Sequence, residues 1–239
     1  MFVVAVLTFV TRGRPRKLPK HGTKDAMVLE RKLFAEIGEC GDVDGAIKRV
    51  AKEYGVREDS LKRWIRGDPY LKNVIRDIRV IKGGTDPRVI GSQLEILTSF
   101  AIVTAIIELG KKFEYQMLEL FRSGDHDGVD IIVQHKETKS VQIAVECKNW
   151  DAEKYLGVMN EKVADREIFD RFKHSAKEYG EQKHKVIVWG GKPELDKNVQ
   201  AKLDADYIEI VLGEQVDLIK SLIDGKHFWR LVEEFKKLL

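Results

Sequence analysis

The stretch from Asp125 to Lys148, DHDGVDIIVQHKETKSVQIAVECK, constrains the fold more than any other part of the chain. It contains two short apolar runs, one from Val129 to Val133 and one from Val141 to Lys148, separated by the polar turn HKETKS. Two runs of strand length around a short polar turn predict a β-hairpin.

Alternation along the second run separates its residues into two faces. We expect Val141, Ile143, Val145 and Cys147 on one face, and Gln142, Ala144, Glu146 and Lys148 on the other. The hairpin would bring Asp130, near the start of the first run, to the same end as Glu146 and Lys148. Two interpretations remain open for these charges: a solvated edge with a surface ion pair, or a metal site in which Asp130 and Glu146 offer the oxygen ligands that Mg²⁺ prefers.

The segment GVDIIV, followed by a turn and then by VQIAVECKNW, resembles the core of the PD-(D/E)xK nucleases. Asp130 matches the motif Asp, Glu146-Cys147-Lys148 matches ExK, and Val129 stands where the motif has Pro. The likeness covers roughly residues 90–190 and is closest to Mrr-type restriction endonucleases and archaeal Holliday-junction resolvases.

This resemblance implies an α/β fold with a restriction-endonuclease-like core, ordered helix, three strands, helix, strand. It also implies Mg²⁺, or Mn²⁺ in its place, held by Asp130, Glu146, the backbone carbonyl of Cys147 and Glu95. Glu95 could equally be a helix N-terminal acid that complements the helix dipole. Lys148 would position or activate the attacking water.

The rest of the chain supplies the elements that this core requires. We expect a long apolar helix from Gly91 to Leu109, a strand from Phe113 to Leu120, a helix from Val158 to Tyr179 and a buried strand from Lys185 to Trp189. A further helix near residues 195–204, a strand from Tyr207 to Val211 and two C-terminal helices follow.

The charge of the chain is divided unevenly. Residues 1–82 hold 19 Lys and Arg against 11 Asp and Glu, whereas the remainder holds 23 against 28. A basic N-terminal part indicates nucleic acid as its partner. The two cysteines give no disulfide framework, and the apolar residues 1–10 are too few to span a bilayer, so we expect an intracellular, cytoplasmic protein that does not bind a membrane.

The segment from Thr11 to Lys24, TRGRPRKLPKHGTK, has six basic residues and no acid. It is either a basic tail or a DNA-binding arm. RGRP resembles the AT-hook and the arm before the helix-turn-helix of Hin-type invertases. That likeness implies that Arg12 and Arg14 enter a minor groove.

Three helices are predicted next, from Asp25 to Gly38, from Val43 to Tyr54 with Asp42 as N-cap, and from Glu58 to Arg66. The pattern AIKRVAKEYGVREDSLKRWIRG resembles a helix-turn-helix, although an ordinary three-helix cluster also fits. In the helix-turn-helix interpretation, DNA faces three basic side chains of the last helix, namely Lys62, Arg63 and Arg66.

The chain is therefore divided into an apolar start and basic arm (1–24), a small all-α helix-turn-helix domain (25–82) and a nuclease domain (88–239). The predicted function is metal-dependent hydrolysis of phosphodiester bonds in DNA, by a homodimer if both strands are cut. A structure-selective Holliday-junction resolvase and a DNA-binding regulator with an inactive nuclease core remain alternatives.

Overall fold

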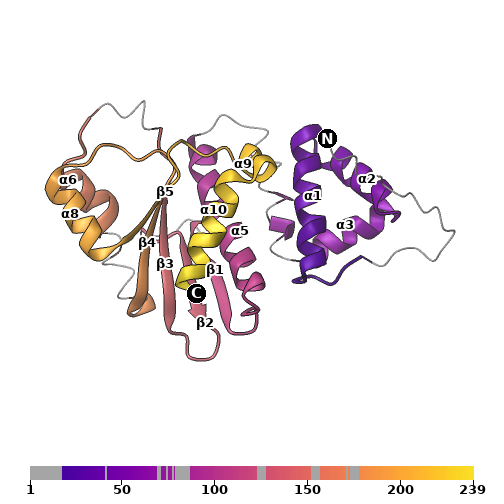
Figure 1. The fold of residues 1–239 in the computed structure, drawn as a ribbon, viewed down its shortest axis with the longest axis horizontal. Helices are drawn as coiled ribbons and strands as arrows, with labels where there is room; N and C mark the ends of the chain where they lie inside the picture. Colours follow the sequence, from indigo (N-terminus) through magenta and orange to yellow (C-terminus); the bar gives the residue numbers. More distant parts are fainter. Residues whose placement is uncertain are drawn as a thin grey trace, which may run out of the picture.

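A five-stranded mixed sheet with helices on both faces forms the larger part of the molecule, and three further helices lie beside it (Figure 1). The structure is a computed structural model. It describes residues 18–40, 42–68, 71–73, 75, 76, 78, 87–122, 128–151, 157–170, 172 and 178–239. The predicted arm residues Arg12 and Arg14 lie outside these ranges, as does the apolar start of the chain.

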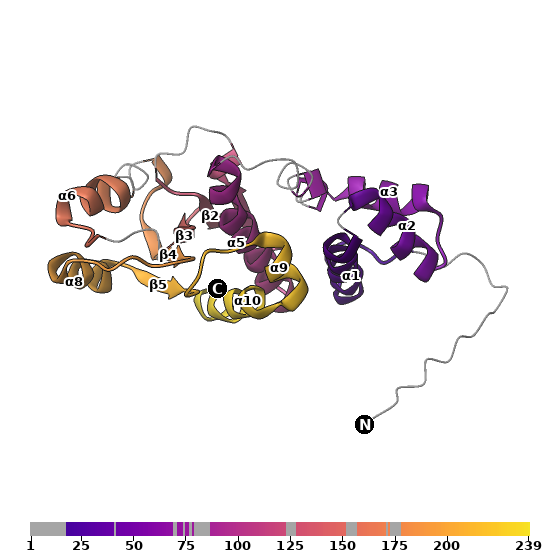
Figure 2. The same cartoon turned by 90° about the horizontal axis from the view of Figure 1, so that it is seen from above.

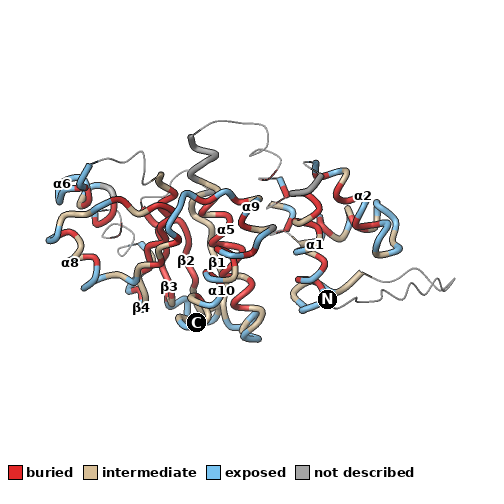
Figure 3. The backbone as a smooth tube through the Cα atoms, turned by 45° about the horizontal axis from the view of Figure 1, so that its top comes forward, coloured by how far each residue is buried: buried red, intermediate tan, exposed pale blue. Residues whose placement is uncertain are grey.

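The strands follow one another across the sheet in chain order. They are β1 (Tyr115–Glu119), β2 (Ile131–His135), β3 (Val141–Lys148), β4 (Gln182–Trp189) and β5 (Ile208–Val211). The first three pair antiparallel, and β3, β4 and β5 pair parallel. The predicted hairpin is thus β2–β3, and β3 is the central strand. Figure 3 shows buried backbone running through the middle strands.

The register of the hairpin has one irregularity, which corrects the predicted face of Val141. Val133 pairs with Ile143, but Gln134 pairs with Val141, so that Gln142 is an extra residue on β3. Because a bulge displaces the alternation by one residue, Val141 packs with Ala144 and not with Ile143. The side chain of Gln142 instead donates to the carbonyl of Leu238.

Helices cover both faces of the sheet (Figure 2). One face packs against α5 (Pro87–Glu108), α9 (Leu218–Asp224) and α10 (Lys226–Leu238). The other packs against α6 (Glu161–Ala164), the π-helical turn after it and α8 (Lys197–Asp206). The order α5, three strands, α6, β4 is the predicted core order.

The helix predicted from Val158 begins later. Asn160 is the N-cap of α6, since its side chain accepts from the backbone N–H of Val163, and Val158 lies outside the helix and is exposed. After α6 the chain widens into a π-helical turn over Asp165–Phe169. The end of this predicted helix lies partly outside the described residues.

The three N-terminal helices are α1 (Lys24–Cys40), α2 (Val43–Glu53) and α3 (Glu58–Gly67). Asp42 caps α2 as predicted, because its side chain accepts from two backbone N–H groups. Gly55 ends α2 in the left-handed conformation, with a φ of 63°. The N–H groups of Gly55 and Val56 bond to the carbonyls of Lys52 and Ala51, which is the Schellman pattern of helix termination.

These helices pack directly on the part of the chain that carries the sheet. Figures 1 and 2 both place α1 between α2–α3 and α9. Phe34 of α1 meets Phe100 of α5 edge-on, with ring centroids 5.0 Å apart, and Phe100 in turn stacks on Phe228 of α10. Because α5 is covered by the sheet and by other helices, it is apolar nearly all round. In the described part of the chain, no helix is long and apolar enough to cross a membrane.

Candidate active site

Asp130 is bound to the backbone of β3 at two points. Its N–H donates to the carbonyl of Val145 at 2.8 Å, and its Oδ2 accepts from the N–H of Cys147 at 2.6 Å. The side chain is 4% exposed. The hairpin therefore places the Asp130 carboxylate at the end of β3, as the sequence predicted.

Glu146 and Lys148 lie on the same face of β3, two residues apart. The Lys148 Nζ contacts the Glu146 Oε1, and the two residues are only 7% and 2% exposed. Of the two open interpretations, the solvated surface ion pair is therefore wrong. Removing such charges from water costs several kcal/mol each, by order of magnitude, so a buried pair of this kind is weak evidence for a purely stabilising role.

Glu95 of α5 lies near the same strand end, half-buried. The pKa of the Cys147 thiol is raised well above its ordinary value, chiefly by burial and then by the charges of Asp130, Glu95 and Glu146. A thiol in such surroundings stays protonated, so the group that Cys147 can offer to a metal is its backbone carbonyl. Within the described residues, Glu95 does not form a three-ligand cluster with Asp130 and Glu146.

The residues after Lys148 anchor this end of the strand. Asn149 is buried, and its side chain accepts from the N–H of Val216 at 2.7 Å and donates to its carbonyl at 3.1 Å. The loop before α9 is thereby fixed to the strand that carries the site. Trp150 packs edge-on against Trp189, with ring centroids 5.5 Å apart. No pattern in the sequence predicts the Asn149–Val216 contact, because the two residues are 67 positions apart.

The predicted DNA-binding residues of α3 differ in their surroundings. Arg63 and Arg66 are exposed, whereas Lys62 is half-buried and lies 3.6 Å from Asp44 of α2. Lys62 and Arg66 line one groove of about 510 Å³, which is also lined by Asp44, Ile47, Ile65, Lys72, Ile75 and Arg76. Arg63 is not among the residues that line it. The acidic loop residues 125–127 lie outside the described ranges.

The strand end thus combines two buried carboxylates with one ammonium group. Carboxylate and carbonyl oxygens are the donors that a hard divalent cation such as Mg²⁺ takes, and Mg²⁺ commonly needs only one or two carboxylates besides water and substrate. The donor set fits such an ion. An adjacent lysine can stabilise negative charge or orient a water molecule.

Comparison with known proteins agrees with this geometry. The family Mrr_cat, described as restriction endonuclease, matches residues 98–222. The match includes all five strands with Asp130, Glu146 and Lys148, and it begins after Glu95. No curated protein and no solved structure matches the chain. Because the family covers more than half of the sequence, the chain belongs to the Mrr_cat family of restriction endonucleases.

Proposed function

We propose that the chain is a Mg²⁺-dependent DNA endonuclease whose N-terminal helices direct it to DNA. The observation that carries the proposal is the constellation at the end of β3, where Glu146 and Lys148 are buried beside Cys147, whose N–H donates to the buried Asp130 carboxylate. Membership of the restriction endonuclease family supports the reaction class. The choice of Mg²⁺ rests on the donor chemistry.

The proposed roles follow from the donor types. Asp130, Glu146 and the carbonyl of Cys147 would hold the metal, with Glu95 as an outer acid that reaches it directly or through water. The ion, when bound, would polarise the scissile phosphate and lower the pKa of a water molecule. Lys148 would orient that water, because its ammonium group is fixed by Glu146. Mn²⁺ has similar ligand preferences and should substitute.

DNA targeting is assigned to the N-terminal helices. The sharp turn at Gly55 joins α2 to α3 as in a helix-turn-helix, and the groove beside α3 carries four basic side chains, Lys62, Arg66, Lys72 and Arg76. Arg63 is exposed on the same helix, and Arg12 and Arg14 precede the bundle in sequence. Phosphate contacts by such residues would supply affinity without requiring a particular sequence. Cutting both strands of a duplex would require two copies of the site, so we include a homodimer in the proposal.

The decisive experiment measures cleavage of three substrates: linear duplex, supercoiled plasmid and a four-way junction. Each is incubated with the full chain in Mg²⁺ or in EDTA, with Glu146→Gln as the control for contaminating nuclease. We expect Mg²⁺-dependent cleavage of duplex and plasmid that the variant lacks. The variant should be compared by circular dichroism with the original chain, to show that both are folded.

The other outcomes distinguish the alternatives. Cleavage confined to the four-way junction would identify a structure-selective resolvase. DNA binding without cleavage of any substrate would support a regulator with an inactive core, although all three motif residues are present. Equal cleavage by Glu146→Gln would show that the constellation at the end of β3 is not the active site.

A further inference from the structure

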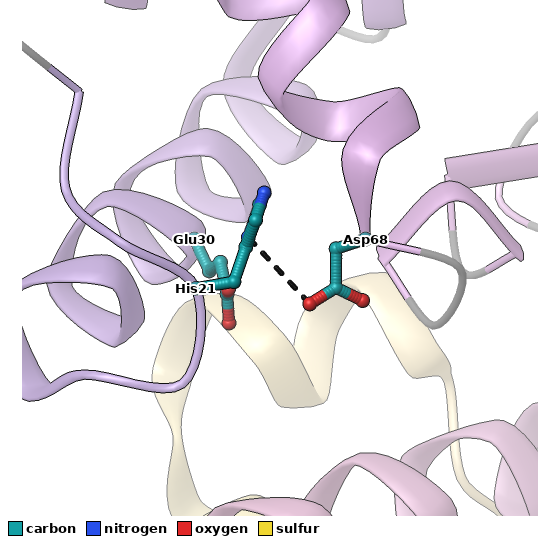
Figure 4. A group of neighbouring side chains, drawn as sticks. All are labelled: His21, Glu30 and Asp68. Carbon is teal, nitrogen blue, oxygen red and sulfur yellow. Dashed lines mark ion pairs between the residues drawn. The ribbon is translucent and has the colours of Figure 1, made fainter.

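A second group of metal-ligating side chains lies among the N-terminal helices, away from the nuclease strands. His21 precedes α1, Glu30 lies within α1, and Asp68 follows α3. One ligand atom from each comes within 4.8 Å of the other two, and no other group of three meets this condition in the described part of the chain. Figure 4 shows the three side chains converging from these separate segments.

The surroundings of His21 fix the orientation of its ring. The imidazole stacks on the indole of Trp64, with ring centroids 4.4 Å apart and planes 22° apart. The same indole donates from Nε1 to the carbonyl of Pro19 at 2.7 Å. Trp64 of α3 therefore holds both the segment before α1 and the ring of His21. A ligand oriented in this way loses little conformational freedom when it binds an ion.

The distance between His21 and Asp68 fits two ligands of one ion better than it fits a hydrogen bond. The His21 Nδ1 lies 3.5 Å from the Asp68 Oδ2 and is buried without a hydrogen-bond partner among the described residues. A good N–H···O bond is shorter, at about 2.7–3.2 Å. Two donors that bind one tetrahedral ion at about 2.1 Å are separated by about 3.4 Å.

The carboxyl of Glu30 is buried and lies near the negative charge of Asp68. Its pKa is raised to about 7, chiefly by burial and then by the charge of Asp68, and Lys112 opposes both. Lys112, which lies between α5 and β1, also donates to the carbonyl of His21 at 3.4 Å. A cation at the centre of the cluster would relieve the repulsion between Glu30 and Asp68.

We propose that His21, Glu30 and Asp68 form a structural site for a divalent transition metal, with Zn²⁺ as the ion that fits best. One imidazole nitrogen and two carboxylate oxygens are a three-ligand set for Zn²⁺, and water completes the coordination. The imidazole distinguishes this site from an all-oxygen Mg²⁺ site. The bound ion joins the segment before α1, α1 itself and the end of α3, and so fixes the start of the chain on the helical bundle.

The experiment measures binding of Zn²⁺ to the full chain by equilibrium dialysis, on a background that carries Asp130→Asn and Glu146→Gln. This background removes the acids of the nuclease strands, so the result does not depend on the proposed nuclease site. His21→Phe is the test variant, because it keeps the aromatic stack on Trp64 and removes both nitrogens. His184→Phe on β4 is the matched control, and Co²⁺ absorption reports the coordination directly.

We expect one Zn²⁺ per chain, and a loss of about 100-fold in affinity for His21→Phe but not for His184→Phe, since even an indirect partner of a metal ligand costs 10–100-fold when it is removed. Lys112→Met should strengthen binding by about three- to tenfold, because it removes a neighbouring positive charge. Equal affinity in the His21→Phe chain, or no bound Zn²⁺ in a chain shown to be folded, would overturn the proposal. If His21→Phe does not fold, Glu30→Gln must lose the Co²⁺ spectrum for the proposal to stand.

Discussion

Two groups of carboxylates in this molecule are assembled in different ways. Glu146 and Lys148 lie on β3 and Asp130 immediately precedes β2, so their separation is set by the strand period and by backbone hydrogen bonds. His21, Glu30 and Asp68 come from three segments that only the packing of helices brings together. The first group is therefore fixed locally, whereas the second depends on tertiary contacts throughout the bundle. Substitutions of the site residues themselves and of the buried residues between the helices should distinguish the locally fixed group from the group that depends on packing.

The largest expected effect is on catalysis at the strand group. Lys148→Ala should lower the cleavage rate by about 10²–10⁴-fold, the range that a positioned acid–base group contributes, while Mg²⁺ still binds. Glu146→Gln and Asp130→Asn should lose metal binding as well, because they remove oxygen charge. Cleavage in Mg²⁺ and DNA binding in Ca²⁺ measure the two properties separately, with Lys183→Ala on β4 as the control. Cleavage at the original rate by Lys148→Ala would remove this lysine from the mechanism.

The next effect is on stability, and it concerns the helix packing that brings His21, Glu30 and Asp68 together. Phe34 is 2% exposed and meets Phe100. Phe34→Ala should lower the free energy of unfolding by about 3–5 kcal/mol, the usual cost of removing a buried aromatic ring. Urea unfolding gives the value, and Val28→Ala, an exposed position on the same helix, is the control. Because Asp130, Glu146 and Lys148 do not contact Phe34, the cleavage rate per folded molecule should stay unchanged. A cleavage rate that falls together with the stability would show that α1 supports the active site.

The same contact bears on the proposed division at residue 88. A fragment of residues 88–239 should fold alone, because it contains the whole sheet and its covering helices apart from the first residue of α5. Phe100 would lose Phe34 but keep Phe228, so we expect a cooperative melt at a lower temperature than that of the full chain. A fragment without a cooperative transition would mean that α1 completes the nuclease fold.

The two groups also show what the sequence could predict. Strand alternation and a short turn were sufficient to place Asp130, Glu146 and Lys148 together, because their geometry is local. The predicted face of Val141 was wrong, because nothing in the alternation of the sequence indicates the bulge at Gln142. The group at His21 was missed because its members are 9 and 38 positions apart in the chain and no spacing rule connects them. The early start predicted for the helix after β3 ignored the capping signal of Asn160.

A smaller effect concerns the pH dependence of stability in the metal-free protein. The pKa of Glu30 is raised from 4.5 to about 7, so the folded chain holds a proton that the unfolded chain releases between these values. Stability should fall as the pH rises through this window, by about 1–2 kcal/mol after allowance for the partial exposure of the group. Glu30→Gln should remove this loss, whereas Asp25→Asn should not. Urea unfolding in EDTA at pH 5 and pH 8 measures it; the same pH dependence in both variants would contradict the assignment.

The smallest effect per residue is expected in DNA binding, and it tests whether the N-terminal helices carry the affinity. Each phosphate contact that is lost should reduce the slope of log affinity against log salt by about one unit. Arg66→Ala and Arg63→Ala should each do so, as should Arg12→Ala and Arg14→Ala. Lys62→Ala should have a weaker effect, because Asp44 already lies 3.6 Å from its ammonium group. Arg230→Ala, an exposed arginine on α10, is the control.

The pattern of slopes can locate the surface that faces DNA. Lys62 and Arg66 line the groove beside α3, and Arg63 does not, so a slope change at Arg66 alone would place DNA along the groove. A change at Arg63 alone would place it on the face of α3 next to the groove, because residues three apart on a helix are separated by about 60° around its axis. The acids Glu58 and Asp59 in the first turn of α3 repel phosphate, which favours an approach nearer to the end of the helix. If DNA still binds and the slope is unchanged in every one of these variants, the residues that contact DNA lie outside α1–α3. These helices would then have only a structural role.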